Sequence, residues 1–248
     1  MIKLGNTSLN GIPKIAVVIK DKVTKETIKS LHVDVLELRV DQFADLDIEY
    51  IVNDIRERKD IGPALILTVR NAESEGGKSD ISDDKKLEIF QAVTPLVDAI
   101  DIELRSPIIS KVIDLAKKNK KLVIVSSHNL TDTPEDAILE GVLQDAVKKG
   151  ADIVKVATQA NSIEDVNQLM MFTLKHKDDN VITMSLGNIG SISRLTFPSV
   201  GSLLTYSYIG QPSASGQVPL ERLQQDLRLY YPKYNQYFVD TFNVLEDV

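Results

Sequence analysis

A lysine lies in the middle of a stretch that otherwise predicts a buried strand. Residues 152–157 read DIVKVA, follow a Lys-Gly pair, and are β-branched at positions 153, 154 and 156. An ammonium group is costly to bury unless it is paired or loses its proton. Lys155 is therefore either an edge-strand or ion-paired structural lysine, or a lysine kept dry so that its amine can attack a carbonyl carbon.

A histidine and several arginines end other apolar runs, and they favour the second interpretation. An iminium formed on Lys155 would act as an electron sink, and a base must then take a proton from the neighbouring carbon. His128 suits that role because the unperturbed pKa of imidazole is about 6.5. The arginines indicate an anionic substrate. Loss of a hydroxyl after proton removal would make the protein a dehydratase, whereas cleavage of a carbon–carbon bond would make it an aldolase.

The elements that must position these residues alternate between apolar runs and helix-like stretches. The apolar runs are residues 14–19, 35–40, 64–69, 99–104, 122–125, 152–157, 181–186 and 202–209. Helices are predicted at 83–97, 107–118, 134–149, 162–177 and 219–231, and several of these stretches begin with Ser, Thr or Pro. Between 187 and 199 there is room for only a short helix. Eight strand–helix units in about 250 residues predict an α/β fold of the (β/α)8, or TIM, barrel type.

Side chains alternate across a strand, so a period of two selects the residues that face the barrel lumen. That period groups the polar residues of six successive runs on one face, mostly late in each strand, where barrel active sites form. The predicted lumen residues are Glu37, Arg39, Asp41, Thr68, Arg70, Asp101, Glu103, Arg105, Ser126, His128, Lys155, Thr183 and Ser185. We interpret the set as a polar pocket around Lys155.

Bulk properties narrow the remaining possibilities. The chain has 248 residues, is 43% hydrophobic and carries a formal net charge of −7, so we expect one barrel domain over residues 1–248 and no nucleic-acid partner. A short hairpin is expected at 1–13, and the tail at 232–248 has no assigned structure. The chain has no cysteine and three histidines, so neither disulfides nor a metal site are expected. No apolar run reaches 18 residues and no signal peptide is evident, so a cytoplasmic protein without a membrane partner is predicted.

Seven short motifs together resemble the type I 3-dehydroquinate dehydratases, the Schiff-base lyases of the shikimate pathway. They are ELRVD (37–41), TVR (68–70) followed by EGG (75–77), DIE (101–103), SSHN (126–129), IVKVA (153–157), ISR (192–194) and SASGQ (213–217). Each motif alone is unspecific, but the ordered set extends over nearly the whole chain.

The resemblance implies roles for individual residues. Lys155 would form the Schiff base with 3-dehydroquinate, His128 would be the general base and then the acid, and Glu75 would pair with His128, although Glu73 competes for that position. The implied substrate-binding residues are Glu37, Arg39 and Arg70 for the ring hydroxyls, with Arg194, Ser213 and Gln217 for the carboxylate. The family needs no metal or organic cofactor, and its members are often homodimers.

Two other functions stay open from the residues alone. Gly187 and Gly190 could form a phosphate loop after the seventh strand, as barrels often have, which would suit a class I aldolase acting on a sugar phosphate. A catalytically silent barrel that only binds an acidic metabolite is the second alternative. Lys155 and His128 argue against it, because a binding site gains little from a buried lysine beside a base.

Overall fold

Eight parallel strands form the inner wall of the molecule in the computed structural model, which describes residues 2–9, 11–70, 81–212 and 215–243. The strands are β3 (Ile15–Ile19), β4 (Val35–Arg39), β5 (Ala64–Thr68), β6 (Ala99–Glu103), β7 (Leu122–Asn129), β8 (Ile153–Gln159), β9 (Val181–Leu186) and β10 (Thr205–Tyr208). Each coincides with one of the eight predicted runs, and β7 and β8 extend a few residues further. The predicted (β/α)8 barrel type is confirmed.

The strands follow one another around the barrel in sequence order, except at a single seam. Each of β3 to β8 pairs with the next strand, and β10 returns to pair in parallel with β3. Among the described residues β9 and β10 share no ladder; the amide of Leu203 donates to the carbonyl of Val181 at 2.9 Å instead. The short strand β11 (Val218–Pro219) pairs with β10 where Ser207 faces Val218. We call the gap between β9 and β10, together with the neighbouring strand β11, the β9–β10 seam.

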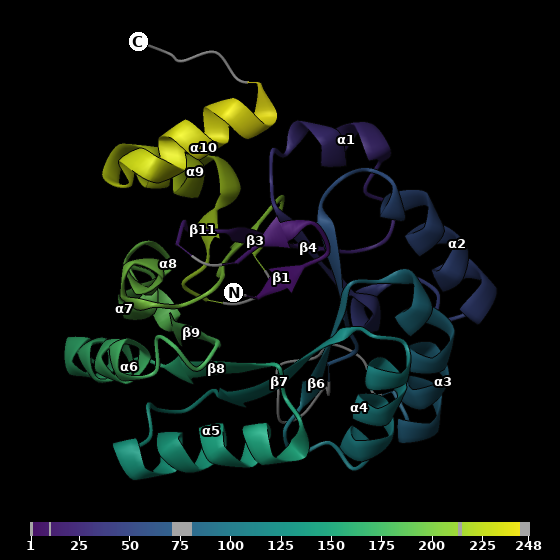
Figure 1. The fold of residues 1–248 in the computed structure, drawn as a ribbon, viewed down its shortest axis with the longest axis horizontal. Coiled ribbons are helices and arrows are strands. Elements are labelled where there is room, and N and C mark those ends of the chain that lie inside the picture. The colour runs from purple at the N-terminus through teal and green to yellow at the C-terminus, as the bar shows by residue number, and fades with distance from the viewer. Residues whose placement is uncertain (1, 10, 71–80, 213–214, 244–248) are drawn as a thin grey trace.

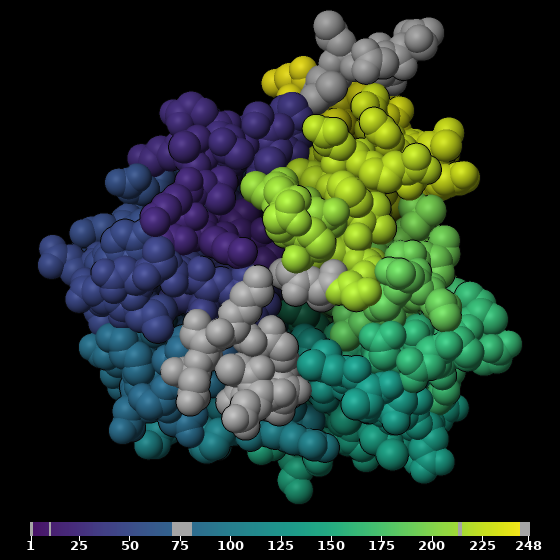
Figure 2. Space-filling view, turned by 180° about the vertical axis from the view of Figure 1, so that it is seen from behind, coloured from purple at the N-terminus to yellow at the C-terminus, as the bar shows by residue number. Residues whose placement is uncertain are grey.

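Helices surround the strands (Figure 1). They are α1 (Lys25–Ser30), α2 (Ile48–Lys59), α3 (Asp83–Val93), α4 (Ile109–Lys118), α5 (Asp136–Lys149), α6 (Ile163–Lys175), α7 (Gly187–Gly190), α8 (Ser193–Thr196), α9 (Leu220–Tyr230) and α10 (Pro232–Phe242). The 3-10 turns η1 (Val40–Gln42), η2 (Thr94–Leu96) and η3 (Phe197–Val200) complete the connections. Figure 2 shows the chain passing around one face of the molecule in sequence order, from purple through teal to yellow-green.

Local sequence explains where the helices begin and end. Ser162 caps α6 in a reciprocal capping box with Asp165, and the Ser82 hydroxyl accepts the amide of Lys85 at the start of α3. Gly150 ends α5 at φ 105°, a left-handed conformation that side chains other than glycine adopt at a steric cost. These boundaries place the end of each strand, and hence its last polar side chain, on one rim of the barrel.

Two apolar cores lie on the two sides of the strands. The larger core fills the space between strands and helices, where Leu36, Leu38 and Val40 of the second unit are fully buried. The smaller core fills the lower lumen with residues such as Ile124 and Ile153 and continues to Leu4 of the N-terminal hairpin. That hairpin, β1 (Lys3–Leu4) paired with β2 (Thr7–Ser8), confirms the prediction for the first residues. Only the upper lumen is therefore left for polar groups.

One predicted strand face was wrong. Thr183 and Ser185 of β9 were expected in the lumen, but Ile182, Met184 and Leu186 belong to the lumen core. The Thr183 hydroxyl instead lies 2.6 Å from that of Thr173 in α6, and the amide of Ser185 donates to Ser193 Oγ in α8. The polar residues of β9 thus face the helix layer, where Thr183 finds its side-chain partner and Ser185 a partner for its backbone amide.

The C-terminal segment, which had no assigned structure, forms α10 from Pro232 to Phe242 and packs against α9 (Figure 1). Tyr234 and Phe238 are buried, and the Tyr237 hydroxyl donates to Asp34 at 2.5 Å. Across the described residues no helix is long and apolar enough to cross a membrane.

Candidate active site

One cavity at the carboxyl ends of the strands brings together every predicted catalytic or substrate-binding residue that the structure describes. Its volume is about 290 Å³. The predicted residues that line it are Glu37, Arg39, Arg70, His128, Lys155, Arg194 and Gln217. Glu75, Ser213 and the competing Glu73 lie outside the described residues.

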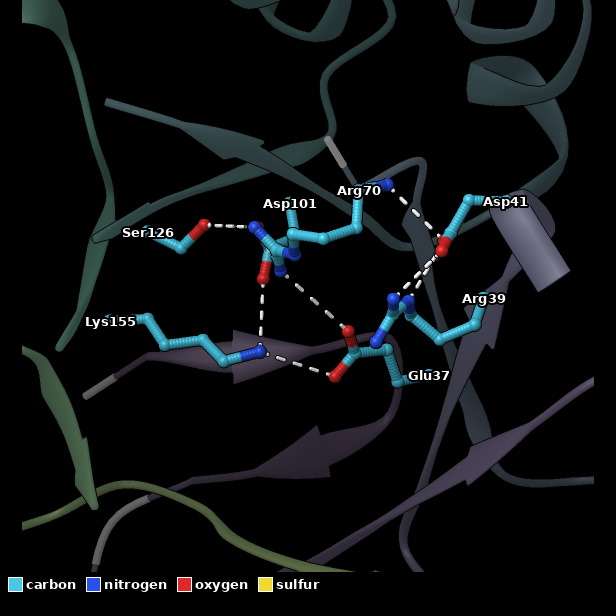
Figure 3. Close-up of polar contacts among 7 residues, drawn as sticks. All are labelled: Glu37, Arg39, Asp41, Arg70, Asp101, Ser126 and Lys155. Atoms are coloured by element: carbon cyan, nitrogen blue, oxygen red, sulfur yellow. Dashed lines mark hydrogen bonds and ion pairs between the residues drawn. The ribbon is translucent and has the colours of Figure 1, made fainter. Parts of the chain in front are cut away.

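Lys155 occupies the floor of this cavity between two carboxylates. It extends from β8 into the lumen and is 4% exposed. Its Nζ lies 3.2 Å from Glu37 Oε2 and 3.1 Å from Asp101 Oδ2 (Figure 3), and 4.2 Å from the centre of the Tyr206 ring. Lys155 therefore has the features of both interpretations made from sequence, because its amine is shielded from water and is also ion-paired.

Arg70 holds the two carboxylates in place from the opposite side. Its Nη2 lies 3.0 Å from Asp101 and 4.0 Å from Glu37, and its Nη1 donates to Ser126 Oγ at 2.6 Å (Figure 3). Ser126 in turn donates to Asp101 at 2.6 Å. Burial disfavours the charge on Asp101, but Arg70 and then Lys155 outweigh it and hold the pKa of this carboxyl well below its usual range. Asp101 therefore stays ionised at neutral pH.

Arg39 is oriented by a third carboxylate, that of Asp41, beyond the end of β4. Its Nε and Nη2 donate to the two oxygens of Asp41 at 2.8 and 2.7 Å, in the bidentate geometry that guanidinium and carboxylate favour (Figure 3). The Asp41 carboxylate also accepts the backbone amide of Arg70 at 3.2 Å. This contact ties the end of β4 to the end of β5 and fixes the direction of both arginines.

His128 lies on β7, the strand next to that of Lys155. The register places Ser126 beside Lys155 and His128 beside Ala157, so the imidazole is one inward-facing position nearer the cavity mouth than the lysine. Burial, and then the positive charges of Arg70 and Lys155, lower the pKa of His128 well below its usual 6.5. The imidazole is thus neutral at pH 7 and can accept a proton.

Arg194 of α8 faces the same cavity, and no described residue forms an ion pair with it. Its side chain is 2% exposed, and in the described part of the chain its Nε and Nη1 have no hydrogen-bond partner. Burial lowers the pKa of this guanidinium to about 10. The backbone is held in place because Thr205 Oγ1 donates to the carbonyl of Arg194 at 2.7 Å. An unpaired, buried cation beside a cavity is a site for an anion.

Comparison with known proteins places this site in a family. The family model described as type I 3-dehydroquinase matches residues 15–233. The chain belongs to the type I 3-dehydroquinase family.

Individual relatives extend over most of the same segment. The chain is 39% identical to the 3-dehydroquinate dehydratase of Thermodesulfovibrio yellowstonii over 86% of this chain and 93% of the relative. It is 36% identical to that of Hydrogenobaculum sp., over 88% and 99% of the two chains. The crystal structure of the Aquifex aeolicus enzyme superposes with a TM-score of 0.77 at 34% identity, over 88% of this chain and 99% of that one.

Two residues at the centre of this 3-dehydroquinase site were not among the predicted catalytic or binding residues. Asp101 was predicted to face the lumen as one of the carboxylates near Lys155 but was not assigned as a catalytic or binding residue, although its alternation with Glu103 along one strand was a usable signal. Tyr206 was not predicted at all, because the run at 202–209 has hydroxyl-bearing or aromatic residues on both faces. No group of three His, Cys, Asp or Glu side chains in the described ranges could hold a metal ion.

Proposed function

We propose that this chain converts 3-dehydroquinate to 3-dehydroshikimate by removing water, through a Schiff base on Lys155. The observation that carries the proposal is the position of a dry lysine between two carboxylates, with a neutral histidine on the adjoining strand. Membership of the type I 3-dehydroquinase family supports the same reaction.

Lys155 is proposed to act first. Its amine, once deprotonated, attacks the ketone carbon of the substrate, and loss of the ketone oxygen as water leaves a protonated imine. The nitrogen of that cation stays near the position of Nζ, about 3 Å from the carboxylates of Glu37 and Asp101. Fixed carboxylates stabilise a cation that forms in a site shielded from water.

His128 is proposed to transfer the proton. Its neutral imidazole takes a proton from the carbon adjacent to the imine carbon, and the electron pair moves toward the iminium. The same imidazolium then protonates the hydroxyl that leaves from the next carbon, so one group serves as base and acid. Addition of water to the conjugated imine carbon releases the product and restores the amine of Lys155.

The cationic residues are proposed to orient the substrate. Arg194 suits the carboxylate because its two unpaired nitrogens face the cavity. Arg39, Arg70 and Glu37 are proposed to contact the ring hydroxyls, and Gln217 lines the cavity on the side of the β9–β10 seam. Ser213 and the glutamate partner of His128, Glu75 or Glu73, stay predictions from sequence.

The alternatives raised from sequence are not favoured. Gly187 and Gly190 have a packing reason: a Cβ on Gly190 would lie 2.6 Å from the carbonyl of Ser185, and one on Gly187 would lie 2.4 Å from the Gln159 amide nitrogen. Their presence is therefore no argument for a phosphate loop and an aldolase. A barrel that only binds a metabolite would not explain why an acid–base residue lies beside Lys155.

The oligomeric state and the location of the enzyme are proposals of the same kind. We propose a homodimer, on the strength of the resemblance, with light scattering at several protein concentrations as the measurement. A cytoplasmic location stays a prediction, which fractionation of the source cells would test.

Borohydride trapping tests the proposed reaction directly. Incubation with 3-dehydroquinate and borohydride is expected to add one ligand to Lys155, as peptide mapping would show, and the enone of the product should absorb in the ultraviolet. Lys155→Met should abolish both the adduct and turnover while the protein stays folded. Lys111→Met, the same change at an exposed site on α4, is the control and should keep both. An adduct on a different lysine would refute the assignment.

A further inference from the structure

Ser126 carries a buried hydroxyl at the centre of the site that the proposed reaction does not use. The residue lies on β7 and is fully buried. The strand register places it beside Lys155 of β8 on one side and beside Glu103 of β6 on the other, two residues before His128. Its hydroxyl contacts two charged side chains (Figure 3). A polar group in this position can control how those charges are directed.

The direction of both hydrogen bonds of this hydroxyl is fixed by the chemistry of its partners. Arg70 Nη1 lies 2.6 Å from Ser126 Oγ, and a guanidinium can only donate, so the serine oxygen accepts. The single hydroxyl proton is then left for Asp101 Oδ1, which is also 2.6 Å away. Ser126 therefore joins a cation to an anion, as an acceptor from the first and a donor to the second.

This arrangement divides the two oxygens of Asp101 between different partners. Oδ1 accepts from Ser126 and lies 3.0 Å from Arg70 Nη2, whereas Oδ2 lies 3.1 Å from Lys155 Nζ. Burial raises the pKa of Asp101, but the charges of Arg70 and Lys155, and then the hydrogen bond from Ser126, lower it by more. One oxygen of an ionised carboxylate is thus kept for the nitrogen that reacts.

Without the hydroxyl, the geometry favours a different pairing. Arg70 Nη1 would lose its acceptor, and two nitrogens of a guanidinium favour the two oxygens of one carboxylate. Since Nη2 already lies 3.0 Å from Asp101 Oδ1, rotation of the carboxylate would bring Oδ2 to Nη1. That rotation would take Oδ2 away from Lys155. The Ser126 hydroxyl prevents it because it occupies Nη1.

We propose that Ser126 is a positioning residue for the reaction of Lys155, and that it holds Arg70 Nη1 and Asp101 Oδ1 so that Asp101 Oδ2 stays directed at the lysine nitrogen. The inference rests on the proposed function. In that reaction the nitrogen changes from an ammonium to a free amine and then to a protonated imine, so its attraction for Asp101 is lost and regained. A carboxylate held from its other side stays in place through the uncharged stage and needs no reorganisation when the cation forms.

Ser126→Ala tests this role because it removes the hydroxyl and little else. The variant should keep the KM of the wild type and show a kcat about 10- to 100-fold lower, the effect expected of one hydrogen bond to a charged group. Borohydride added at successive times after mixing with 3-dehydroquinate should show that the imine forms more slowly. Ser185→Ala makes the same change at a fully buried strand serine that faces the helices, and it should alter neither quantity.

Two further variants separate positioning from packing. Ser126→Thr keeps the hydroxyl and should restore most of the lost kcat. In a double-mutant cycle, Ser126→Ala should have little further effect in an Asp101→Asn background, because the proposed action passes through the Asp101 carboxylate. Where Asp101→Asn does not fold, the comparison of the alanine and threonine variants decides. An unchanged kcat in Ser126→Ala, an equally slow Ser126→Thr, or additive effects in the cycle would each overturn the proposal.

The proposed function can be refuted separately from this role. Wild-type protein that turns over 3-dehydroquinate through an adduct on Lys155, with an equally fast Ser126→Ala variant, would refute the positioning role alone. Wild-type protein that forms neither adduct nor product would refute the dehydratase reaction, and this inference with it.

Discussion

Replacing Arg194 by methionine should make the empty protein more stable and the enzyme much less active. Methionine resembles the aliphatic part of arginine in length and flexibility but carries no charge. Arg194 is 2% exposed and two of its nitrogens have no partner in the described chain, so the described residues leave its charge poorly compensated when no ligand is bound.

The pKa of Arg194 gives the size of this penalty. A pKa lowered from 12.5 to about 10 means that folding disfavours the charged form by about 3 kcal/mol. Since the folded pKa is the lower of the two, this penalty is present in full below about pH 10. Lost packing around a shorter side chain offsets about 1 kcal/mol of the gain. The variant should therefore unfold with a free energy about 2 kcal/mol higher than that of the wild type.

Denaturant unfolding at pH 7 and steady-state kinetics check the two halves of this prediction. The variant should lose about 2–5 kcal/mol of transition-state binding, seen as a fall in kcat/KM, because the substrate carboxylate loses its buried partner. Saturating product should stabilise the wild type more than the variant. Arg222→Met on α9, where the side chain is exposed and pairs with Asp226, should alter neither quantity. A destabilised Arg194→Met protein with unchanged kcat/KM would refute the reasoning.

Three other changes probe the remaining groups of the site. His128→Ala should slow turnover by about 10²–10⁴-fold while borohydride still traps the ligand on Lys155; normal turnover would assign the proton transfer to another group. Because burial and the charges of Arg70 and Lys155 lower the pKa of His128 in the free enzyme, the acid-side fall of kcat/KM should have its midpoint well below pH 6.5 in the wild type, and a midpoint near 6.5 would contradict this. Asp101→Asn removes one partner of two buried cations and should lower the free energy of unfolding by about 3–5 kcal/mol, measured in urea; a value near zero would show that Arg70 and Lys155 find another anion.

Much of the fold could be predicted because the strands of a parallel barrel are buried on both faces and read as short apolar runs. The same property explains the mistake in β9. Thr183 and Ser185 alternate with apolar residues, as a polar lumen face would, but their partners Thr173 and Ser193 are in helices that pack against the strand from outside. Sequence alternation shows which residues share a face and leaves open whether that face points to the lumen or to the helices.

Residues of the candidate site could be predicted where a charged side chain interrupts an apolar strand, as Lys155 interrupts its strand. Tyr206 carried no such signal, because tyrosine is common in strands and buried cores alike. Asp101 was found as a lumen residue, yet its importance depends on Arg70 and Ser126, which lie 31 and 25 positions away in sequence and meet it only in the closed barrel. Distances of that kind follow from topology and register rather than from local pattern.

The β9–β10 seam has a consequence for local unfolding. The amide of Gly187 at the end of β9 donates to the carbonyl of Ser215 at 3.2 Å, and Ser207 Oγ donates to Val218 at 2.7 Å, so the residues after β10 bridge the gap that strand pairing leaves. Few backbone hydrogen bonds then resist opening at this point, and its amides should exchange with solvent hydrogen faster than those of β6 to β8. Ser215 and Gln217 also line the cavity, so a bound ligand is held by the segment that closes the wall. Ligand binding and closure of the seam are thus coupled, because the closed, slowly exchanging state of the seam is also the state that holds the ligand.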